Sequence, residues 1–152
     1  MSPAADFQLN VKQNWCPGCG DFSVQAAIQR ALGNLGRAPH EVVIVSGIGC
    51  SSRLPGYINA YGFHSIHGRS LPLAQGVKLA NPALTVLACG GDGDGFAIGM
   101  GHTIHAMRRN LDITYIVMDN HVYGLTKGQV SPRSDRGFVT KTSPDGSAET
   151  PV

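Results

Sequence analysis

The nine residues LACGGDGDG, 87–95, set the architecture, because an apolar run ends in glycines around an aspartate and leads directly into a helical pattern. Glycines let a phosphate group approach the backbone, and the first turn of a helix offers free N–H groups and the positive end of the helix dipole. The stretch predicts a strand, a turn that binds a diphosphate, and a helix. Asp92, at the end of the strand, would give a carboxylate oxygen to Mg²⁺, which prefers oxygen ligands.

A second set of ligands is expected where the next apolar run, 113–118, ends. It is followed by the sequence DNHVYG, residues 119–124. The carboxyl ends of adjacent parallel strands meet at one edge of a sheet, so Asn120 can give a side-chain oxygen and Val122 a backbone carbonyl to the ion held by Asp92. Each motif alone is equally consistent with an ordinary turn. Together, at matched strand ends, they favour a site for a metal and a diphosphate.

The apolar pattern of the remaining chain predicts an α/β fold. Short runs rich in β-branched residues hardly alternate, as expected of strands covered on both faces: 42–45, 84–88 and 113–118. Apolar residues at helical spacing predict three helices, at 21–33, 70–80 and 95–109. This alternation is typical of a mainly parallel sheet flanked by helices.

The C-terminal part, residues 124–152, is polar and rich in turn residues, and no convincing helix or strand is predicted there. A structureless segment of this length is unusual in a compact domain. We therefore expect either a mobile tail or a chain that is a truncated piece of the fold. Residues 1–152 are expected to form one domain, with a separate cluster-ligand segment at about 1–20.

Cysteines form the second chemical signal. Cys16 and Cys19 are two residues apart in the turn WCPGCG, and Cys50 follows the first predicted strand. Thiolates at this spacing hold zinc or an iron–sulfur cluster. A thioredoxin-like pair would follow a buried strand, and residues 7–14 are too polar for one. Cys89 is expected to be a buried, apolar-like thiol at the end of its strand.

Composition excludes some functions. The 152 residues carry a formal charge of only +2, with scattered basic residues, which disfavours nucleic acid or an anionic membrane as a partner. No apolar stretch reaches membrane-spanning length, and the N-terminus lacks the pattern of a secretory signal. The expected location is the cytoplasm, where the cysteines would stay reduced.

Taken together, the motifs resemble the β subunit of 2-oxoacid:ferredoxin oxidoreductases, most closely the 2-oxoglutarate type. The resemblance extends in order over residues 14–132, through WCPGCGD, GIGCSSR, HGRSLPLAQGVKLA, GGDGD and DNHVYGLTKGQVSP. It implies the thiamine-diphosphate-binding fold. It also implies that Mg²⁺ and thiamine diphosphate are bound by Asp92, Asn120 and the carbonyl of Val122, and a [4Fe-4S] cluster by Cys16, Cys19 and Cys50, with the fourth ligand beyond residue 152.

Further site residues follow from the same resemblance. The residues expected to surround the cofactor are Ile48, Gly49, Cys50, Ser51, His67, Gly68, Gly91, Gly93, Asp94, Tyr123, Gly124 and Leu125. Any of three basic residues would suit the carboxylates of the substrate: Arg53, Arg69 and Lys127. Thiamine enzymes use a glutamate to activate the aminopyrimidine, and no glutamate lies between Glu41 and Glu149. The resemblance therefore implies that a partner α subunit supplies it.

The implied activity is oxidative decarboxylation of a small 2-oxoacid with coenzyme A, giving an acyl-CoA, CO₂ and electrons for ferredoxin, or the reverse carboxylation. Two other functions fit parts of the sequence. A non-catalytic zinc or iron–sulfur electron-transfer module would use the cysteines and leave the glycine motifs as turns. A thiamine-dependent decarboxylase without an electron path would use the glycine motifs and leave the cysteines without a role.

Overall fold

The computed structural model describes residues 4–152, so the first three residues of the predicted cluster-ligand segment lie outside the described part. One four-stranded sheet dominates it, built from β1 (Val42–Ser46), β2 (Tyr61–His64), β3 (Thr85–Gly91) and β4 (Thr114–Met118). The principal helices are α1 (Gly20–Asn34), α2 (Ser70–Ala80) and α3 (Met100–Arg109). Shorter helical turns cover Ala5–Phe7, Pro39–Glu41, Ser51–Gly56 and Asp94–Ile98. The prediction of a parallel sheet flanked by helices is confirmed.

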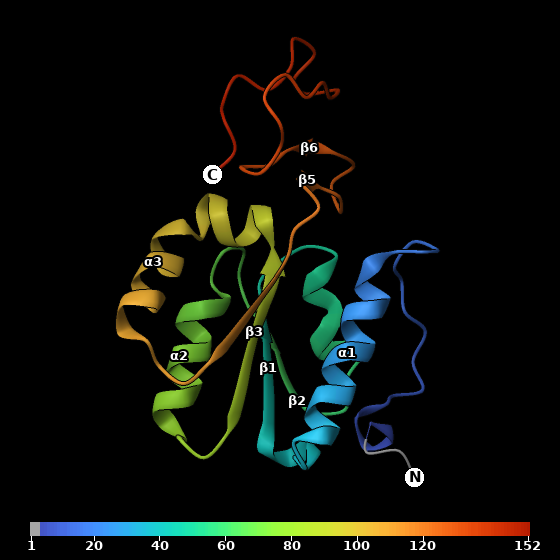
Figure 1. Ribbon diagram of the computed structural model, residues 1–152, viewed down its shortest axis with the longest axis vertical. Helices are drawn as coiled ribbons and strands as arrows, with labels where there is room; N and C mark the ends of the chain where they lie inside the picture. The colour runs from blue at the N-terminus through green and yellow to red at the C-terminus, as the bar shows by residue number, and fades with distance from the viewer. Residues whose placement is uncertain (1–3) are drawn as a thin grey trace.

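The four strands are all parallel, in the order β2-β1-β3-β4. After β1 the chain moves to one side to form β2, and it then returns to the other side of β1 to form β3 (Figure 1). The point where the order reverses therefore lies between the carboxyl ends of β1 and β3. In open parallel sheets, ligands bind in the crevice at such a point.

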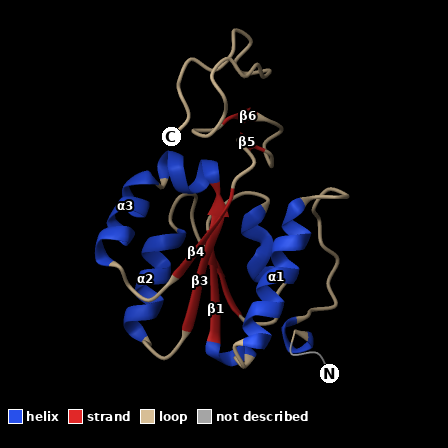
Figure 2. Cartoon of the chain, viewed as in Figure 1, coloured by secondary structure: helices blue, strands red, loops and turns tan. Residues whose placement is uncertain are grey.

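Helices cover both faces of the sheet (Figure 2). Alternate residues of β1 point to opposite faces, as strand geometry requires. Val42 and Ile44 join the cluster that contains Ile28 and Leu32 of α1. The other face packs against α2 through a second cluster of Val43, Val45, Val86, Ala88, Leu71 and Ala74. The sheet core is thus buried on both sides, which explains the continuous apolar runs of its central strands.

The helix predicted at 95–109 is interrupted. A π-helical turn, Asp94–Ile98, precedes α3, and Ala97 within this turn has non-helical backbone angles. The Thr103 hydroxyl donates to the carbonyls of Gly95, at 2.9 Å, and Gly99, at 3.3 Å. Asn110, in the left-handed conformation, ends α3 directly after the predicted last residue, Arg109.

The C-terminal part contains one element that the apolar pattern did not reveal, a small antiparallel pair of β5 (Val122–Tyr123) and β6 (Gln129–Val130). This pair and the segment that follows it lie beyond the carboxyl ends of the sheet strands (Figure 1). Within residues 4–152, no helix is both long and apolar enough to cross a membrane.

Candidate functional site

The loop after β1 and the turn after β3 meet where the strand order reverses. The amide of Gly47 donates to the carbonyl of Cys89 at 3.1 Å, so the two strands stay paired up to the start of the loop. Beyond this point, the Ile48 amide donates to a carboxylate oxygen of Asp94 at 2.9 Å. The two glycine-rich motifs singled out in the sequence therefore form one structure.

Asp94 is the hub of this structure. Its side chain is 2% exposed, and one oxygen, Oδ1, accepts hydrogen bonds from the amides of Ile48, at 2.9 Å, and Gly68, at 2.8 Å. The same oxygen lies 2.9 Å from Nδ1 of His67. Asp94 thus joins the loop after β1, the turn before α2 and the end of β3. Asp94 is also predicted to contact the cofactor directly. Its hydrogen bonds direct Oδ1 toward the protein, so this contact stays a prediction.

Two glycines are required by this packing. A Cβ at Gly47 would lie 1.9 Å from Oδ2 of Asp94, and a Cβ at Gly93 would lie 2.2 Å from the ring of Tyr123. The Tyr123 hydroxyl donates to the carbonyl of Gly93 at 3.1 Å, so this ring holds the Gly-Asp-Gly turn from outside. Burial, together with the carboxylates of Asp92 and Asp94, raises the pKa of Tyr123, which stays a neutral donor at physiological pH.

Asp92 is 1% exposed, and its Oδ2 accepts a hydrogen bond from the hydroxyl of Ser131. Asn120 follows β4 and folds back on the chain, since its Oδ1 accepts from the amide of Val122 at 3.2 Å. The Val122 carbonyl accepts from the amide of Gly124 at 3.0 Å. β3 and β4 are paired up to Gly91 and Met118. Both predicted ligand motifs therefore begin at the same edge of adjacent strands.

A turn formed by Ser131 and Ser134 links these two motifs. The Ser131 amide donates to the hydroxyl of Ser134 at 2.9 Å, and that hydroxyl donates to the carbonyl of His121. Arg133 adds a hydrogen-bonded ion pair with Asp119 at 2.9 Å. Both serines are buried. Sequence reasoning missed this turn, because SPRS in a polar stretch has no signal that distinguishes it from an exposed loop.

Two of the predicted cluster cysteines, Cys16 and Cys19, lie near the third, Cys50, which is in the loop after β1. Cys16 is exposed, whereas Cys19 and Cys50 are partly buried. Trp15 anchors the CPGC turn, since its indole N–H donates to the carbonyl of Cys50 at 2.7 Å. Burial raises the pKa of the Cys50 thiol, and the nearby charges of Asp21, Cys19 and Cys16 raise it further, whereas Arg53 lowers it.

The fourth cysteine, Cys89, belongs to the core. It is 1% exposed, and burial raises its pKa to about 12, with Asp94 and Asp21 adding to the shift. The prediction that Cys89 is a buried, apolar-like thiol is confirmed. Because a metal ligand must be the thiolate, Cys89 is poorly suited to complete a cluster with the other three.

These differences predict the order in which cysteines react in the cluster-free protein. With iodoacetamide near neutral pH, exposed Cys16 should be modified readily and Cys89 should remain unmodified, because the reagent reacts with accessible thiolates. Cys50 should react slowly, and its rate should rise with pH, since a raised pKa leaves little thiolate at neutral pH. Mass spectrometry of peptides after timed labelling measures this order. Equal labelling of Cys89 and Cys16 would contradict it.

The basic residues predicted to bind substrate lie in different surroundings. Arg53 is close enough to Cys50 to affect its pKa, which places it beside the thiols. Arg69 donates to the carbonyls of Gly68, at 3.3 Å, and Ile98, at 3.1 Å, so its guanidinium braces the start of α2. Lys127 is exposed at the tip of the β5–β6 connection, with φ of 75°. Within residues 4–152, the side-chain ammonium of Lys127 makes no hydrogen bond to a backbone carbonyl, whereas the guanidinium of Arg69 does.

Several other predicted cofactor residues lie at or near the reversal point. Among the described residues, nothing within 4 Å would meet a Cβ at Gly49, and the nearest atom to a Cβ at Gly91 is Oγ of Ser51, at 3.6 Å. His67 is partly exposed, and its ring lies 6.1 Å from that of Tyr123. Gly124 and Leu125 are exposed in the β5–β6 connection. The structure thus groups most of the predicted residues around the carboxyl ends of β1, β3 and β4.

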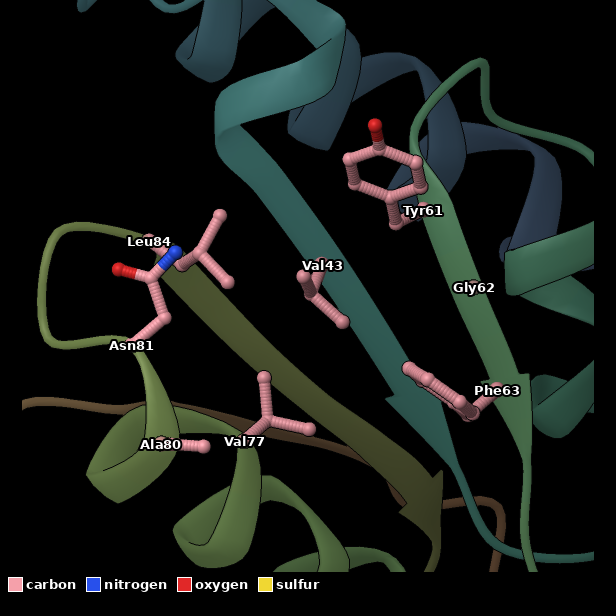
Figure 3. A pocket seen from close by; sticks show the side chains of 8 residues that line it. All are labelled: Val43, Tyr61, Gly62, Phe63, Val77, Ala80, Asn81 and Leu84. Atoms are coloured by element: carbon pink, nitrogen blue, oxygen red, sulfur yellow. The ribbon is translucent and has the colours of Figure 1, made fainter.

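A hollow of about 350 Å³ lies elsewhere, between β2 and the end of α2 (Figure 3). Its wall includes Tyr61 and Phe63 of β2, Val77 of α2 and Leu84 before β3. The described residues that line it include no charged side chain. It therefore lacks the groups that would bind a diphosphate or a cation, and we do not assign the cofactor to it.

The residues at the reversal point fit the expected cofactor. A carboxylate, an amide oxygen and a backbone carbonyl are the oxygen ligands that Mg²⁺ prefers, and Gly49 leaves the backbone open to a phosphate. Among residues 4–152, no three His, Cys, Asp or Glu side chains are placed to hold a single metal ion. The proposed Mg²⁺ site also uses the amide oxygen of Asn120 and the backbone carbonyl of Val122, which are not among these four side-chain types. The cysteines of an iron–sulfur cluster bind different irons, so their thiols need not lie around one ion.

Comparisons with known proteins agree with this arrangement. A family model, "Thiamine pyrophosphate enzyme, C-terminal TPP binding domain", matches residues 47–152. The chain is 51% identical, over 92% of its length, to 2-oxoacid:ferredoxin oxidoreductase 1, subunit beta, from Aeropyrum pernix, of which it covers 44%. It is 49% identical, over 96% of its length, to 2-oxoglutarate oxidoreductase subunit KorB from Mycobacterium tuberculosis, of which it covers 39%.

A solved structure is equally similar. It is the 2-oxoglutarate:ferredoxin oxidoreductase from Magnetococcus marinus with 2-oxoglutarate, coenzyme A and succinyl-CoA bound, which superposes on the whole chain with a TM-score of 0.96 and 45% identity. The chain covers 52% of that structure's chain, so it spans about half the length of such relatives, or less. The chain therefore belongs to the thiamine pyrophosphate enzyme family through its C-terminal TPP-binding domain, and its resemblance to the β subunits of 2-oxoacid:ferredoxin oxidoreductases is confirmed.

Proposed function

We propose that this chain is the thiamine-diphosphate-binding part of the β subunit of a 2-oxoacid:ferredoxin oxidoreductase. Together with an α subunit it would convert a 2-oxoacid and coenzyme A into an acyl-CoA and CO₂, with two electrons passed to ferredoxin, or catalyse the reverse carboxylation. The observation that carries the proposal is that Asp92 and Asn120 follow adjacent strands at the reversal point of the sheet. Cys50 belongs to the loop after β1, and Cys16 and Cys19 lie close enough to it to affect the pKa of its thiol.

Each group of residues has a part in this proposal. Asp92, Asn120 and the Val122 carbonyl would hold Mg²⁺, and the open backbone at Gly49 would receive the diphosphate. When bound, thiamine diphosphate supplies the carbanion chemistry at the 2-oxo carbon. The protein orients the substrate, excludes water and neutralises charge.

The redox part rests on Cys16, Cys19 and Cys50, which would bind three irons of a [4Fe-4S] cluster. A bound cluster would keep these thiols deprotonated despite the raised pKa of Cys50, because coordinated metal favours the thiolate. The fourth ligand would be a group other than Cys89. Such a cluster and free cysteines suit a reducing cytoplasm, which is the location we propose.

The favoured substrate is 2-oxoglutarate, supported by two relatives whose names contain it. Its second carboxylate needs a cation, and Lys127, which is exposed in the β5–β6 connection, is the residue that we favour among the predicted basic residues. The aminopyrimidine would be activated by a glutamate of the α subunit, because none lies between Glu41 and Glu149.

The test is reduction of a viologen dye by the anaerobically purified complex of the full-length protein and its partner subunit. We expect reduction with 2-oxoglutarate that depends on coenzyme A. Activity with a different 2-oxoacid would change only the substrate. Silence with every 2-oxoacid, in a complex that retains its cluster, would refute the proposal and favour an electron-transfer module.

A further inference from the structure

We infer that Ser131 is a positioning residue for the metal at Asp92, an inference that rests on the proposed function. The Ser131 hydroxyl donates to Oδ2 of Asp92, and both side chains are buried. A carboxylate whose second oxygen is fixed in this way has one orientation. Ser131 lies near the end of the motif DNHVYGLTKGQVSP, 39 residues after its partner in the chain.

The other oxygen of Asp92 is left for a ligand. In the described part of the chain, Oδ1 of Asp92 has no hydrogen-bond partner. The fully buried side-chain atoms that lack a partner there are Oγ of Ser52 and Oδ2 of Asp94. Oδ1 of Asp92 is therefore the carboxylate oxygen that no described protein group satisfies. The serine holds Oδ2 and leaves Oδ1 as the oxygen that would meet a cation. Partners that orient a metal ligand in this way typically tighten metal binding.

The Ser131 hydroxyl is itself held in place. It accepts from the amide of Arg133 at 3.2 Å, which directs its own proton toward Asp92. Ser134 then ties the same turn to the carbonyl of His121, next to Asn120. The turn therefore fixes Asp92 relative to Asn120, the second predicted ligand. Metal binding and the position of the turn should favour one another, since each restricts the same carboxylate.

The experiment measures thiamine diphosphate binding to the full-length protein in its complex, as a function of Mg²⁺ concentration. In Ser131→Ala we expect the half-saturating Mg²⁺ concentration to rise by about 10- to 100-fold. At saturating Mg²⁺ the affinity for thiamine diphosphate should stay within about twofold of wild type. A general loss of structure would instead lower that affinity at every Mg²⁺ concentration.

Ser134→Ala is the matched control, because it removes a buried hydroxyl from the same turn but leaves the contact between Ser131 and Asp92. We expect a smaller rise in the Mg²⁺ requirement than in Ser131→Ala. An unchanged requirement in Ser131→Ala, or an equal rise in both variants, would overturn the inference and leave the proposed function intact. Failure of the wild type to bind thiamine diphosphate with Mg²⁺ would overturn both.

Discussion

Asp92→Ala should lose Mg²⁺-dependent binding of thiamine diphosphate, with the affinity falling by about 100-fold or more, since even changes to outer partners of metal ligands cost about 10- to 100-fold. The physical reason is that the variant removes the one carboxylate among the proposed ligands. It also leaves the Ser131 hydroxyl, which is buried, without its acceptor. Equilibrium dialysis of the complex with thiamine diphosphate, with and without Mg²⁺, measures the loss.

Asp112→Ala is the control for this prediction. It removes the same charge from a carboxylate that is 93% exposed and paired with Lys78 at 2.8 Å, just before β4 and so at its amino end. Its effect on binding should be within about twofold of wild type. Asn120→Ala should weaken binding in the same direction as Asp92→Ala. Unchanged affinity in both site variants would show that the metal is held elsewhere.

Gly47→Ala should destabilise the protein by about 3 kcal/mol, the upper range for overpacking a tight site. The added Cβ would lie 1.9 Å from Oδ2 of Asp94. Asp94 cannot retreat freely, because its other oxygen is held by the amides of Ile48 and Gly68. Relief of the clash would therefore break the connection between the loops. Urea unfolding of the complex, followed by circular dichroism, measures the difference.

Gly76→Ala is the matched control, because it adds the same methyl group to an exposed position of α2 where no described atom lies within 4 Å. It should leave stability unchanged or raise it by up to about 1 kcal/mol, since alanine is the better helix former. If Gly47→Ala were as stable as Gly76→Ala, Asp94 would not be the rigid hub of the site.

The central strands and the site edge were predictable from sequence for a clear reason. Residues of β1 and β3 are buried on both faces, so continuous apolar runs mark them. The helix at Ser70–Ala80 was predicted with the observed bounds, because the asparagine and proline that follow end it. Since parallel strands bring their carboxyl ends together, the positions of the two motifs in the sequence, directly after β3 and β4, suffice to place them at one edge.

Edge strand β2 was missed because its four residues are all exposed. Its conformation is fixed by backbone pairing with β1 and not by an apolar pattern. In α3 the apolar side chains of Ile104 and Met107 are 50% and 66% exposed, whereas Thr103 is buried. Periodicity finds a helix but not the direction in which it faces. The role of Ser131 was also out of reach, because it depends on a contact with a residue distant in the chain.

The most direct test of thiamine diphosphate binding is the cofactor content of the wild-type complex, purified anaerobically with Mg²⁺ and treated with acid to release the cofactor for quantification. We expect thiamine diphosphate in an amount equal to this chain, accompanied by acid-labile sulfide from the cluster. Thiamine diphosphate without sulfide would remove the redox role of Cys16, Cys19 and Cys50. A complex that holds no thiamine diphosphate, and takes up none when it is added with Mg²⁺, would contradict the central claim.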